Sequence, residues 1–291
     1  MIIVVVSRIK DIPYFINKVL PVENRKVLPI ADKDTFVKRF NEEKVCDREK
    51  TDESIRKIFD LPDAATGTDD EIIRCEDVKI SYGNRTILKN FNWSVKRGEH
   101  WALSGENGAG KSTLLSLVCA DNPQAYACNI SLFGFKRGCG ESIWDIKKKI
   151  GYVSPEMYHS YKKNLSAVDI VASGLHDSVG LYKRVTDEER EKVLFWMDIF
   201  GVGSLAQRPY LQLSSGEQRM LLLVRAFVKD PELLVLDEPF HGLDEHRRML
   251  ARAVIDAFCK RKGKTLIMVT HYEEEYPASI DHKLKLKKII D

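Results

Sequence analysis

The chain has 291 residues, of which 44% are hydrophobic and 31% charged, so it can bury a sizeable core in one large or two modest domains. Its formal net charge of +3 is small beside 46 basic and 43 acidic residues, and this balance does not require a nucleic-acid or membrane-surface partner. No apolar run is long enough to cross a bilayer, and the six cysteines include no CxxC pair. We therefore expect a cytoplasmic protein without a transmembrane segment, a zinc site or a disulfide framework.

The first forty residues contain a segment that is similar to the end of the chain. The letters IIVVVSRIKDIPYFINKVL align without a gap with LIMVTHYEEEYPASIDHKL, and in both an acidic residue precedes a proline by two positions. This repeat predicts that residues 1–40 are the tail of a preceding domain of the same kind, in a tandem protein. A coincidental strand–loop–helix similarity is the alternative, because short repeats carry little information.

Two further regions follow along the chain. Residues 41–70 are rich in charge and end in LPDAATGTDD, which predicts a linker with one short helix around residues 53–59. Over residues 71–291, segments typical of strands alternate with segments typical of helices, and this alternation predicts an α/β domain.

A phosphate-binding loop is the most specific motif of the chain. The pattern GxxxxGK[ST] and the residue after it comprise Gly105, Glu106, Asn107, Gly108, Ala109, Gly110, Lys111, Ser112 and Thr113. An apolar strand precedes the loop and an apolar helix follows it, the context in which backbone N–H groups and a helix N-terminus bind phosphates. We expect Lys111 to reach the β- and γ-phosphates of ATP and the Ser112 hydroxyl to ligate Mg²⁺. A glycine-rich turn with a surface lysine is the alternative.

Polar residues also end two strand-like apolar runs further along the chain. Asp237 and Glu238 follow the run at 233–236, and His271 follows the run at 265–269. Because ligands bind at the carboxyl ends of parallel strands, both acids are expected beside the phosphate loop. Asp237 is predicted to hold the magnesium shell, and Glu238 to orient and deprotonate the attacking water. His271 is predicted to hydrogen-bond the γ-phosphate and this water.

These motifs, together with LSSGEQR at 213–219, resemble the ATP-binding cassette (ABC) family over about three quarters of the chain. The resemblance implies a P-loop NTPase fold with a mixed or parallel sheet core, an antiparallel β edge and an inserted helical subdomain at about 154–213. It also implies ATP hydrolysis, with Lys111, Glu238 and His271 as catalytic residues. Further ATP contacts are implied for the aromatic Tyr82, for the signature Ser214, Ser215, Gly216 and Glu217, and for Asp244 in the coupling loop. Ser214 and Glu217 also form a capping box by their spacing alone, and Thr186 and Glu189 form another at the start of a helix of the subdomain.

One position departs from the family pattern. The family has glutamine after the strand IGYV, and this chain has Glu156 in the segment that follows. We expect Glu156 to substitute as a third Mg²⁺ ligand beside Ser112 and Asp237, which leaves the coupling role of this loop open.

A finer resemblance concerns the second half of bacterial tandem ATPases named for molybdate transport or photorepair, which GCGESIWDIKKKIGYVSPE and DEPFHGLD carry. It implies an energy-coupling subunit of a transporter, with molybdate as a substrate association. The implied partners are a second ABC half bound head to tail, or a second copy, and membrane permease subunits; this would bring the protein to the inner membrane face. In the alignment of the start of the chain with its end, Ser7 occupies the position of His271, so the preceding domain would lack that histidine.

A soluble ABC ATPase that acts on nucleic acid or the ribosome is the rival function. No coiled-coil insertion or CxxC hook supports a DNA-repair type, and no nucleic-acid partner is expected. The basic segment HKLKLKK at 282–288 is either a nucleic-acid patch or, more simply, an edge strand with one solvated face. A non-hydrolysing regulatory module is a third class, which the intact Lys111, Asp237, Glu238 and His271 disfavour.

Overall fold

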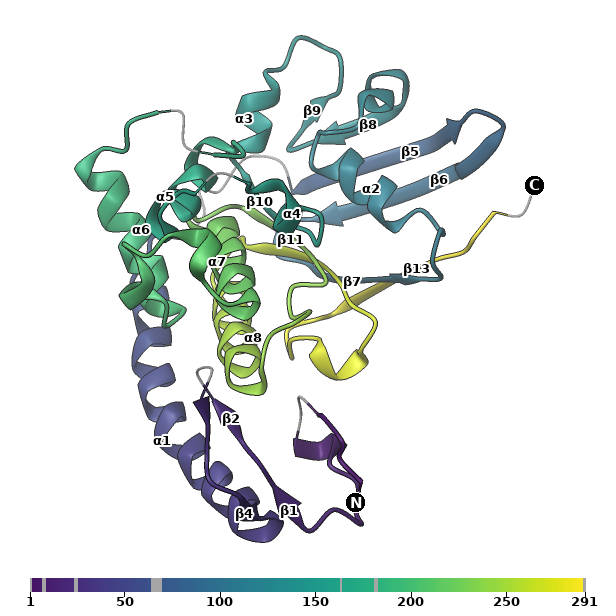
Figure 1. The fold of residues 1–291 in the computed structure, drawn as a ribbon. Helices are drawn as coiled ribbons and strands as arrows, with labels where there is room; N and C mark the ends of the chain where they lie inside the picture. Colours follow the sequence, from purple (N-terminus) through teal and green to yellow (C-terminus); the bar gives the residue numbers. More distant parts are fainter. Residues whose placement is uncertain are drawn as a thin grey trace.

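A five-stranded parallel sheet forms the centre of the computed structural model, which describes residues 2–6, 9–23, 26–63, 70–162, 164–180 and 183–289 (Figure 1). Its strand order is β10-β11-β12-β7-β13, with β7 at His100–Gly105, β10 at Ile150–Val153, β11 at Leu233–Asp237, β12 at Thr265–Val269 and β13 at His282–Leu286. β11 and β12 are buried along their whole length, as expected for strands with helices or a second sheet on both faces. Among the described strands, β13 pairs only with β7, and it alternates between more and less exposed side chains, which agrees with the edge-strand interpretation of HKLKLKK.

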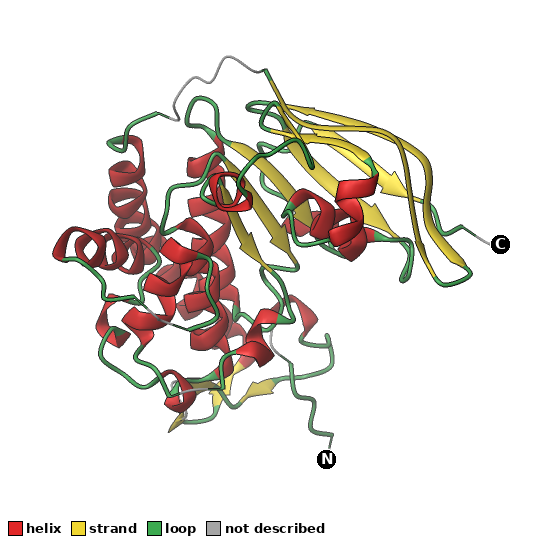
Figure 2. Ribbon diagram, turned by 90° about the horizontal axis from the view of Figure 1, so that it is seen from above, coloured by secondary structure: helices red, strands yellow, loops and turns green. Residues whose placement is uncertain are grey.

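A second sheet of four antiparallel strands lies against one side of the first (Figure 2). Its order is β6-β5-β8-β9, from β5 (Glu71–Tyr82), β6 (Arg85–Lys96), β8 (Asn129–Leu132) and β9 (Phe135–Lys136). The long β5–β6 hairpin brings the end of β5 close to the phosphate loop. The parallel core with its antiparallel neighbour confirms the predicted α/β fold class.

The strands of the parallel sheet separate two hydrophobic cores. Leu234 and Leu236 of β11 face a core shared with the helices, whereas Leu233 and Val235 face the core between the two sheets. This division follows from the alternation of side chains along a strand. The sheet is therefore held in place from both faces, and its carboxyl-end residues are presented at a fixed edge.

We call the core on the side of the parallel sheet away from the antiparallel strands the first core, and the core between the two sheets the second core. Helices fill the first core. α2 (Lys111–Val118) follows the phosphate loop in the second core. α3 (Ile143–Lys147) also packs in the second core, through Ile143 and Ile146. The helices of the first core are α4 (Met157–Ser160), α5 (Ala167–Ala172), α6 (Asp187–Ile199), α7 (Ser215–Phe227) and α8 (Glu245–Cys259). Short 3₁₀ helices lie at Pro123–Ala127 (η2), Ser173–His176 (η3), Gly203–Leu205 (η4), Tyr210–Gln212 (η5) and Glu273–Glu275 (η6). Capping boxes at Thr186 and Ser214 start α6 and α7, as their sequences predict.

The region before the ATPase domain is more helical than predicted. In place of a linker with one short helix around 53–59, a 27-residue helix, α1, extends over Lys33–Phe59 (Figure 1). Asp32 caps its N-terminus by accepting from the Asp34 N–H, and the helix contains neither glycine nor proline. Its C-terminal end packs on α6 and α8 through the buried Ile58. The charged segment that was predicted to be a linker is therefore largely helical.

Small elements precede α1 at its far end. They are η1 (Ile9–Asp11), β1 (Lys18–Val19), β2 (Val22–Glu23), β3 (Lys26–Val27) and β4 (Ala31–Asp32). β1 pairs with β4 and β2 with β3, both antiparallel.

Candidate active site

The phosphate-loop sequence forms a tight turn between β7 and α2. Gly110 precedes α2 in a left-handed conformation, with φ 97°, and a Cβ atom on it would lie 2.8 Å from the Ile87 side chain. A Cβ atom on Gly105 would lie 2.7 Å from the carbonyl oxygen of Leu286. Both positions therefore require glycine, one for its backbone conformation and both for the close approach of neighbouring atoms.

Two cations donate to carbonyl groups of this loop. The Lys111 ammonium donates to the carbonyls of Gly105, at 2.6 Å, and Glu106, at 3.2 Å. The Arg85 guanidinium donates to the carbonyl of Gly108, at 3.2 Å. The loop is thus braced by one charge from its own helix and one from the β5–β6 hairpin.

The acidic pair and the histidine come from adjacent strands. β11 and β12 pair in parallel register, with Asp237 opposite Val269, and the Glu238 N–H continues the ladder by donating to the Val269 carbonyl at 2.9 Å. Glu238 has a left-handed backbone, with φ 47°, which turns its side chain away from the strand direction. His271 follows β12, and its Nε2 lies 3.1 Å from Oε1 of Glu238.

One cavity of about 290 Å³ lies between these elements. The predicted site residues that line it are Asn107, Gly108, Gly110, Lys111, Ser112, Thr113, Glu156, Asp237, Glu238 and His271. The structure thus brings together the phosphate loop, the acidic pair, the histidine and the glutamate at the family's glutamine position. Arg85, Ile87 and Pro155 also line the cavity and were not predicted. Only the position of Arg85, three residues after Tyr82, could have pointed to it from the sequence.

Negative charge is concentrated at the floor of this cavity. Burial raises the pKa of Asp237 to about 6, and the charges of Glu156 and Glu238 add to this effect while Lys111 opposes it. Glu156 is thus close enough to Asp237 to act on it electrostatically. Among the described residues, no three His, Cys, Asp or Glu side chains are grouped closely enough to bind a metal ion unaided.

Several predicted residues lie outside the described lining of this cavity. Within the phosphate loop these are Gly105, Glu106 and Ala109. Tyr82, at the end of β5, is half-exposed, and its hydroxyl accepts from the Asn122 side chain at 3.0 Å. This bond links the end of β5 to the segment that follows the phosphate-loop helix.

The signature residues begin α7 away from the cavity. Ser214 Oγ accepts from the Glu217 N–H at 3.3 Å, and the Glu217 carboxylate accepts from the Ser214 N–H at 2.7 Å. Burial raises the pKa of Glu217, but these hydrogen bonds with Ser214 and the charges of Arg247 and Arg208 outweigh it, so the pKa is lowered. Ser214 and Glu217 therefore stabilise the start of α7 through a reciprocal pair of hydrogen bonds, and the signature residues are not among those that line this chain's phosphate-loop cavity.

Asp244 lies in a second cavity next to the first. This cavity, of about 370 Å³, shares Glu238 and His271 with the phosphate-loop cavity. Asp244 caps α8 by accepting from the Arg247 N–H at 2.8 Å, and it also accepts from the Arg247 guanidinium at 2.7 Å. The predicted coupling residue Asp244 therefore shares a cavity with Glu238 and His271 and is not among the described residues that line the phosphate-loop cavity.

Residues 88–241 match the protein-family model described as "ABC transporter", so the chain belongs to the ABC transporter family, and it is an ABC ATPase domain. It is 47% identical to the Escherichia coli ABC transporter ATP-binding protein ModF over 207 residues, which cover 71% of this chain and 42% of ModF. It is 34% identical to the uncharacterized ABC transporter ATP-binding protein YlmA of Bacillus subtilis, covering 75% of this chain and 82% of YlmA.

A solved structure agrees with the fold. CbiO1 from Clostridium perfringens, described as part of the ABC transporter complex cbiONQ, superposes with a TM-score of 0.61 and 26% identity, covering 76% of this chain and 88% of that one. The predicted family and ATPase class are thereby confirmed. The chain spans about half the length of the curated relatives ModF and the Schizosaccharomyces pombe protein C323.04, at 42% and 54%.

Proposed function

We propose that this chain binds ATP with Mg²⁺ in the cavity beside Lys111 and hydrolyses it by general-base catalysis. The observation that carries this proposal is the 3.1 Å contact between His271 Nε2 and Glu238 Oε1 at the rim of the phosphate-loop cavity. A carboxylate beside a phosphate cradle, with its orientation set by a neighbouring ring nitrogen, has the arrangement of a water-activating base.

The residues present fit a magnesium ion. Asp237, Glu156 and Ser112 line the same cavity with oxygen donors, and the pKa of Asp237 is raised by burial and then by the charges of Glu156 and Glu238, which Lys111 opposes. Mg²⁺ is held by few protein ligands and completes its shell with phosphate and water oxygens. When bound beside these oxygens, the ion would supply positive charge that neutralises the phosphates.

The chain's own residues then divide the chemistry. Lys111 and the loop N–H groups bind the phosphates and hold the γ-phosphate in place. Glu238 accepts the proton of the attacking water, and His271 orients that carboxylate and the water. Tyr82 offers an aromatic face to the adenine, as the family resemblance implies.

A second ATPase domain completes the site in this proposal. The signature begins α7 away from the phosphate-loop cavity, so a head-to-tail partner would supply its own signature to this chain's ATP. The partner is a second domain of the same kind, either in the same polypeptide or in a second copy.

The region 1–40 supports the tandem arrangement. The backbone bonds Ile12 N–H to Ile9 O and Ile16 N–H to Pro13 O have counterparts in the aligned Tyr276 N–H to Glu273 O and Ile280 N–H to Pro277 O. η1 and η6 likewise occupy aligned positions, so the repeat extends from letters to backbone geometry.

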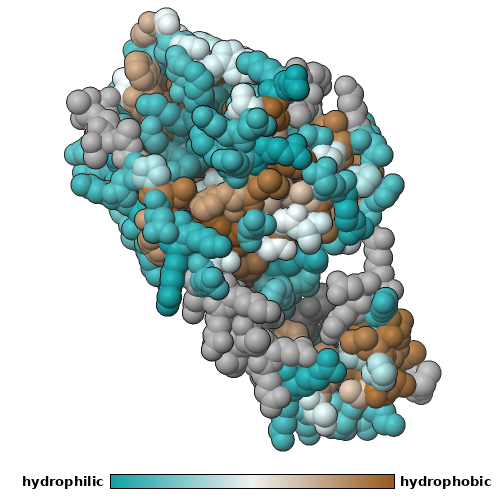
Figure 3. All heavy atoms as spheres, turned by 90° about the vertical axis from the view of Figure 1, so that its left-hand side faces the viewer, coloured by the Kyte–Doolittle hydropathy of each residue, from teal (hydrophilic) through white to brown (hydrophobic). Residues whose placement is uncertain are grey.

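The apolar run in that region lacks the cover that its counterpart has. Ile2 and Ile3 are 71% and 76% exposed, whereas β12, the aligned segment, is buried between two strands. The brown atoms at the bottom of Figure 3 belong to this end of the molecule. A sheet of a preceding ATPase domain would bury such a run. Ser7, aligned with His271, lies outside the described residues; in this proposal the preceding site lacks that histidine.

The process served by hydrolysis is, in this proposal, membrane transport. The names of ModF and YlmA and the cbiONQ complex all refer to ABC transporters. No described helix has the length and apolar character to cross a bilayer. In this proposal, separate permease subunits at the inner face of the membrane carry the substrate. Molybdate is the substrate association that the sequence resemblance suggests.

Affinity capture tests this proposal, with a tag on the tandem polypeptide that would contain this chain, expressed in its own cells. The Glu238→Gln substitution and added ATP are used to keep the two ATPase domains bound to each other. An integral membrane protein in the captured material is the expected result. Ribosomes, DNA or soluble proteins alone would move the function to the non-transport class and leave the ATPase assignment in place. Lys111→Ala, in which we expect ATP binding to be strongly weakened, is the matched control and should lose the ATP-dependent partner.

A further inference from the structure

The two ends of α7 have different surroundings. Its first turn carries the signature, whereas its last turn carries Arg225, and Lys229 is the second residue after the helix ends. A helix of 13 residues is about 20 Å long, so these ends are well separated. Whatever fixes the C-terminal end sets the direction in which the signature is presented.

The C-terminal end of α7 is tightly enclosed between two other elements. A Cβ atom on Gly151 of β10 would lie 2.1 Å from the Ala226 carbonyl oxygen. A Cβ atom on Gly174 of η3 would lie 2.3 Å from the Arg225 carbonyl oxygen. The backbone of α7 therefore contacts the parallel sheet on one side and the predicted helical subdomain on the other. Both contacts are too close for the helix to shift along its axis without a clash.

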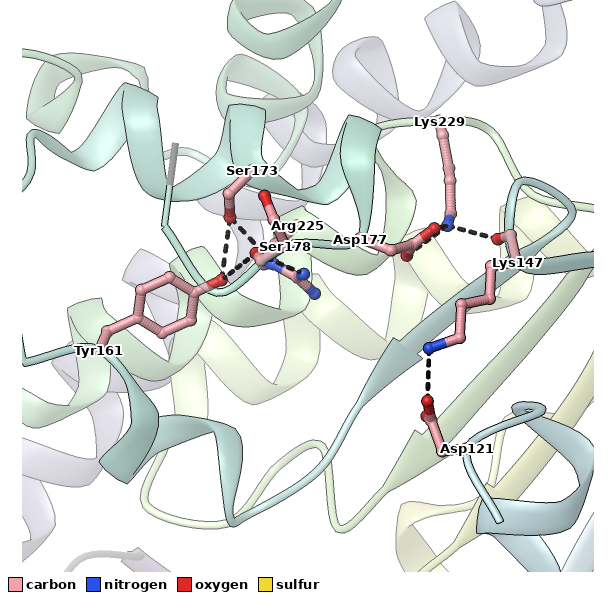
Figure 4. Close-up of polar contacts among 8 residues, drawn as sticks. All are labelled: Asp121, Lys147, Tyr161, Ser173, Asp177, Ser178, Arg225 and Lys229. Atoms are coloured by element: carbon pink, nitrogen blue, oxygen red, sulfur yellow. Dashed lines mark hydrogen bonds and ion pairs between the residues drawn. The ribbon is translucent and has the colours of Figure 1, made fainter. Parts of the chain in front are cut away.

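The Lys229 ammonium group connects the end of α3, which precedes β10, with the residue that follows η3. It donates to both carboxylate oxygens of Asp177, at 2.6 Å each, and to the carbonyl of Lys147, at 2.6 Å (Figure 4). An ammonium has three donors, and here all three are used. The Lys229 side chain is 8% exposed and that of Asp177 22%, so water does little to screen the pair. Asp177 has a left-handed backbone, with φ 50°, which turns its carboxylate toward Lys229.

The contacts continue beyond Lys229 in both directions. Lys147 pairs with Asp121, which lies just after the phosphate-loop helix α2 (Figure 4). On the other side Arg225 donates to the Ser173 hydroxyl and the Ser178 carbonyl, each at 3.1 Å. Hydrogen-bonded and ionic contacts thus run from the end of α2 through the end of α7 to η3.

We propose that Lys229 is a positioning residue for ATP hydrolysis, which locks the C-terminal end of α7 and the η3 turn to the nucleotide-binding core so that the signature is held in one orientation. The effect on catalysis rests on the proposed function, since it matters only if the signature contacts ATP bound by a second domain. The locking itself is a property of a single chain and is tested there.

Hydrogen exchange by mass spectrometry on the full chain tests the locking, with Lys229→Met to remove the charge and keep the stem. We expect exchange to become at least about tenfold faster in segments 166–180 and 213–219, because one partner of a buried ion pair is left alone. The phosphate-loop segment 105–118 should keep its exchange rate. Lys148→Met, in a pair whose side chains are 72% and 69% exposed, is the matched control and should change neither segment.

A binding measurement and a second variant separate a local effect of Lys229 on α7 from a general loss of stability. A fluorescent ATP analogue should bind Lys229→Met within about twofold of the unmodified chain, because the substitution lies outside the cavity. Asp177→Asn keeps the shape of the partner and serves if Lys229→Met does not fold; it should accelerate exchange in the same two segments. Unchanged exchange in both segments, or equal acceleration in 105–118, would overturn the proposal.

Discussion

His271 Nε2 and Glu238 Oε1 lie 3.1 Å apart, although the two residues follow different strands and are separated by the whole of α8. The contact places a ring nitrogen against the carboxylate that also lines the phosphate-loop cavity.

Replacement of Glu238 by glutamine should lower ATP turnover by about 10²–10⁴ and leave ATP binding intact, because the general base is lost while the cavity keeps its shape. Phosphate release and binding of a fluorescent ATP analogue measure the two effects. Glu273→Gln, at an exposed position near His271, should behave like the unmodified chain. Full turnover in Glu238→Gln would remove this residue from the mechanism.

Lys111→Ala should weaken ATP binding by at least about 100-fold, since charge-assisted hydrogen bonds to phosphate are worth about 1.5–3 kcal/mol each. Titration with the same fluorescent analogue gives the dissociation constant. Lys136→Ala, on an exposed position of β9, is the control. Equal affinities in the two variants would contradict the assignment of the phosphate site.

Asp237→Asn should stabilise the fold near neutral pH in the absence of Mg²⁺ and nucleotide. The pKa of Asp237 rises from 3.8 to about 6 on folding, so the native state binds more protons in this window and stability falls as pH rises through it. Asparagine does not ionise, so the free energy of unfolding of the variant does not fall with pH for this reason. We expect a gain of about 1–3 kcal/mol at pH 7.5, which fades as the pH falls toward 3.8.

Urea unfolding at a series of pH values measures that gain. Asp145→Asn, whose side chain is 69% exposed, should show no such pH dependence. A stability difference for Asp237→Asn that stays constant over the whole series would show that the substitution acts through packing and not through the carboxylate's ionisation.

Glu156→Gln restores the family's usual residue and should lower the pKa of Asp237, because Glu156 is one of the charges that raise it. The acid limb of Mg²⁺-dependent ATP binding should therefore move to lower pH, by up to about one unit. Binding of the fluorescent analogue between pH 5 and 8 measures the midpoint. An unmoved midpoint would mean that Glu156 does not act on Asp237 in solution.

Local sequence was sufficient to predict the elements whose chemistry is contiguous. The phosphate loop, the acidic pair after β11 and both capping boxes depend on residues within a few positions of one another, and the structure has them where the letters indicate. The ATPase class follows from these motifs. The roles of the individual residues stay predictions.

What sequence reasoning missed is non-local. Lys229 and Asp177 are 52 positions apart, and nothing in either neighbourhood indicates the pair. Arg85 reaches the loop across the hairpin, from 23 positions away. α1 was missed for a different reason: its charged residues are also good helix formers, and packing of its C-terminal end on α6 and α8 favours the helix.

The in-register pairing of β11 with β12 has a consequence for how the site tolerates change. The spacing between Glu238 and His271 follows from the distance between neighbouring strands, about 4.8 Å, and from the ladder bond that Glu238 makes with Val269. Main-chain atoms, common to every amino acid, set that distance. Core side chains on either face can therefore vary in size and identity over evolution while the separation of the two reactive groups stays the same.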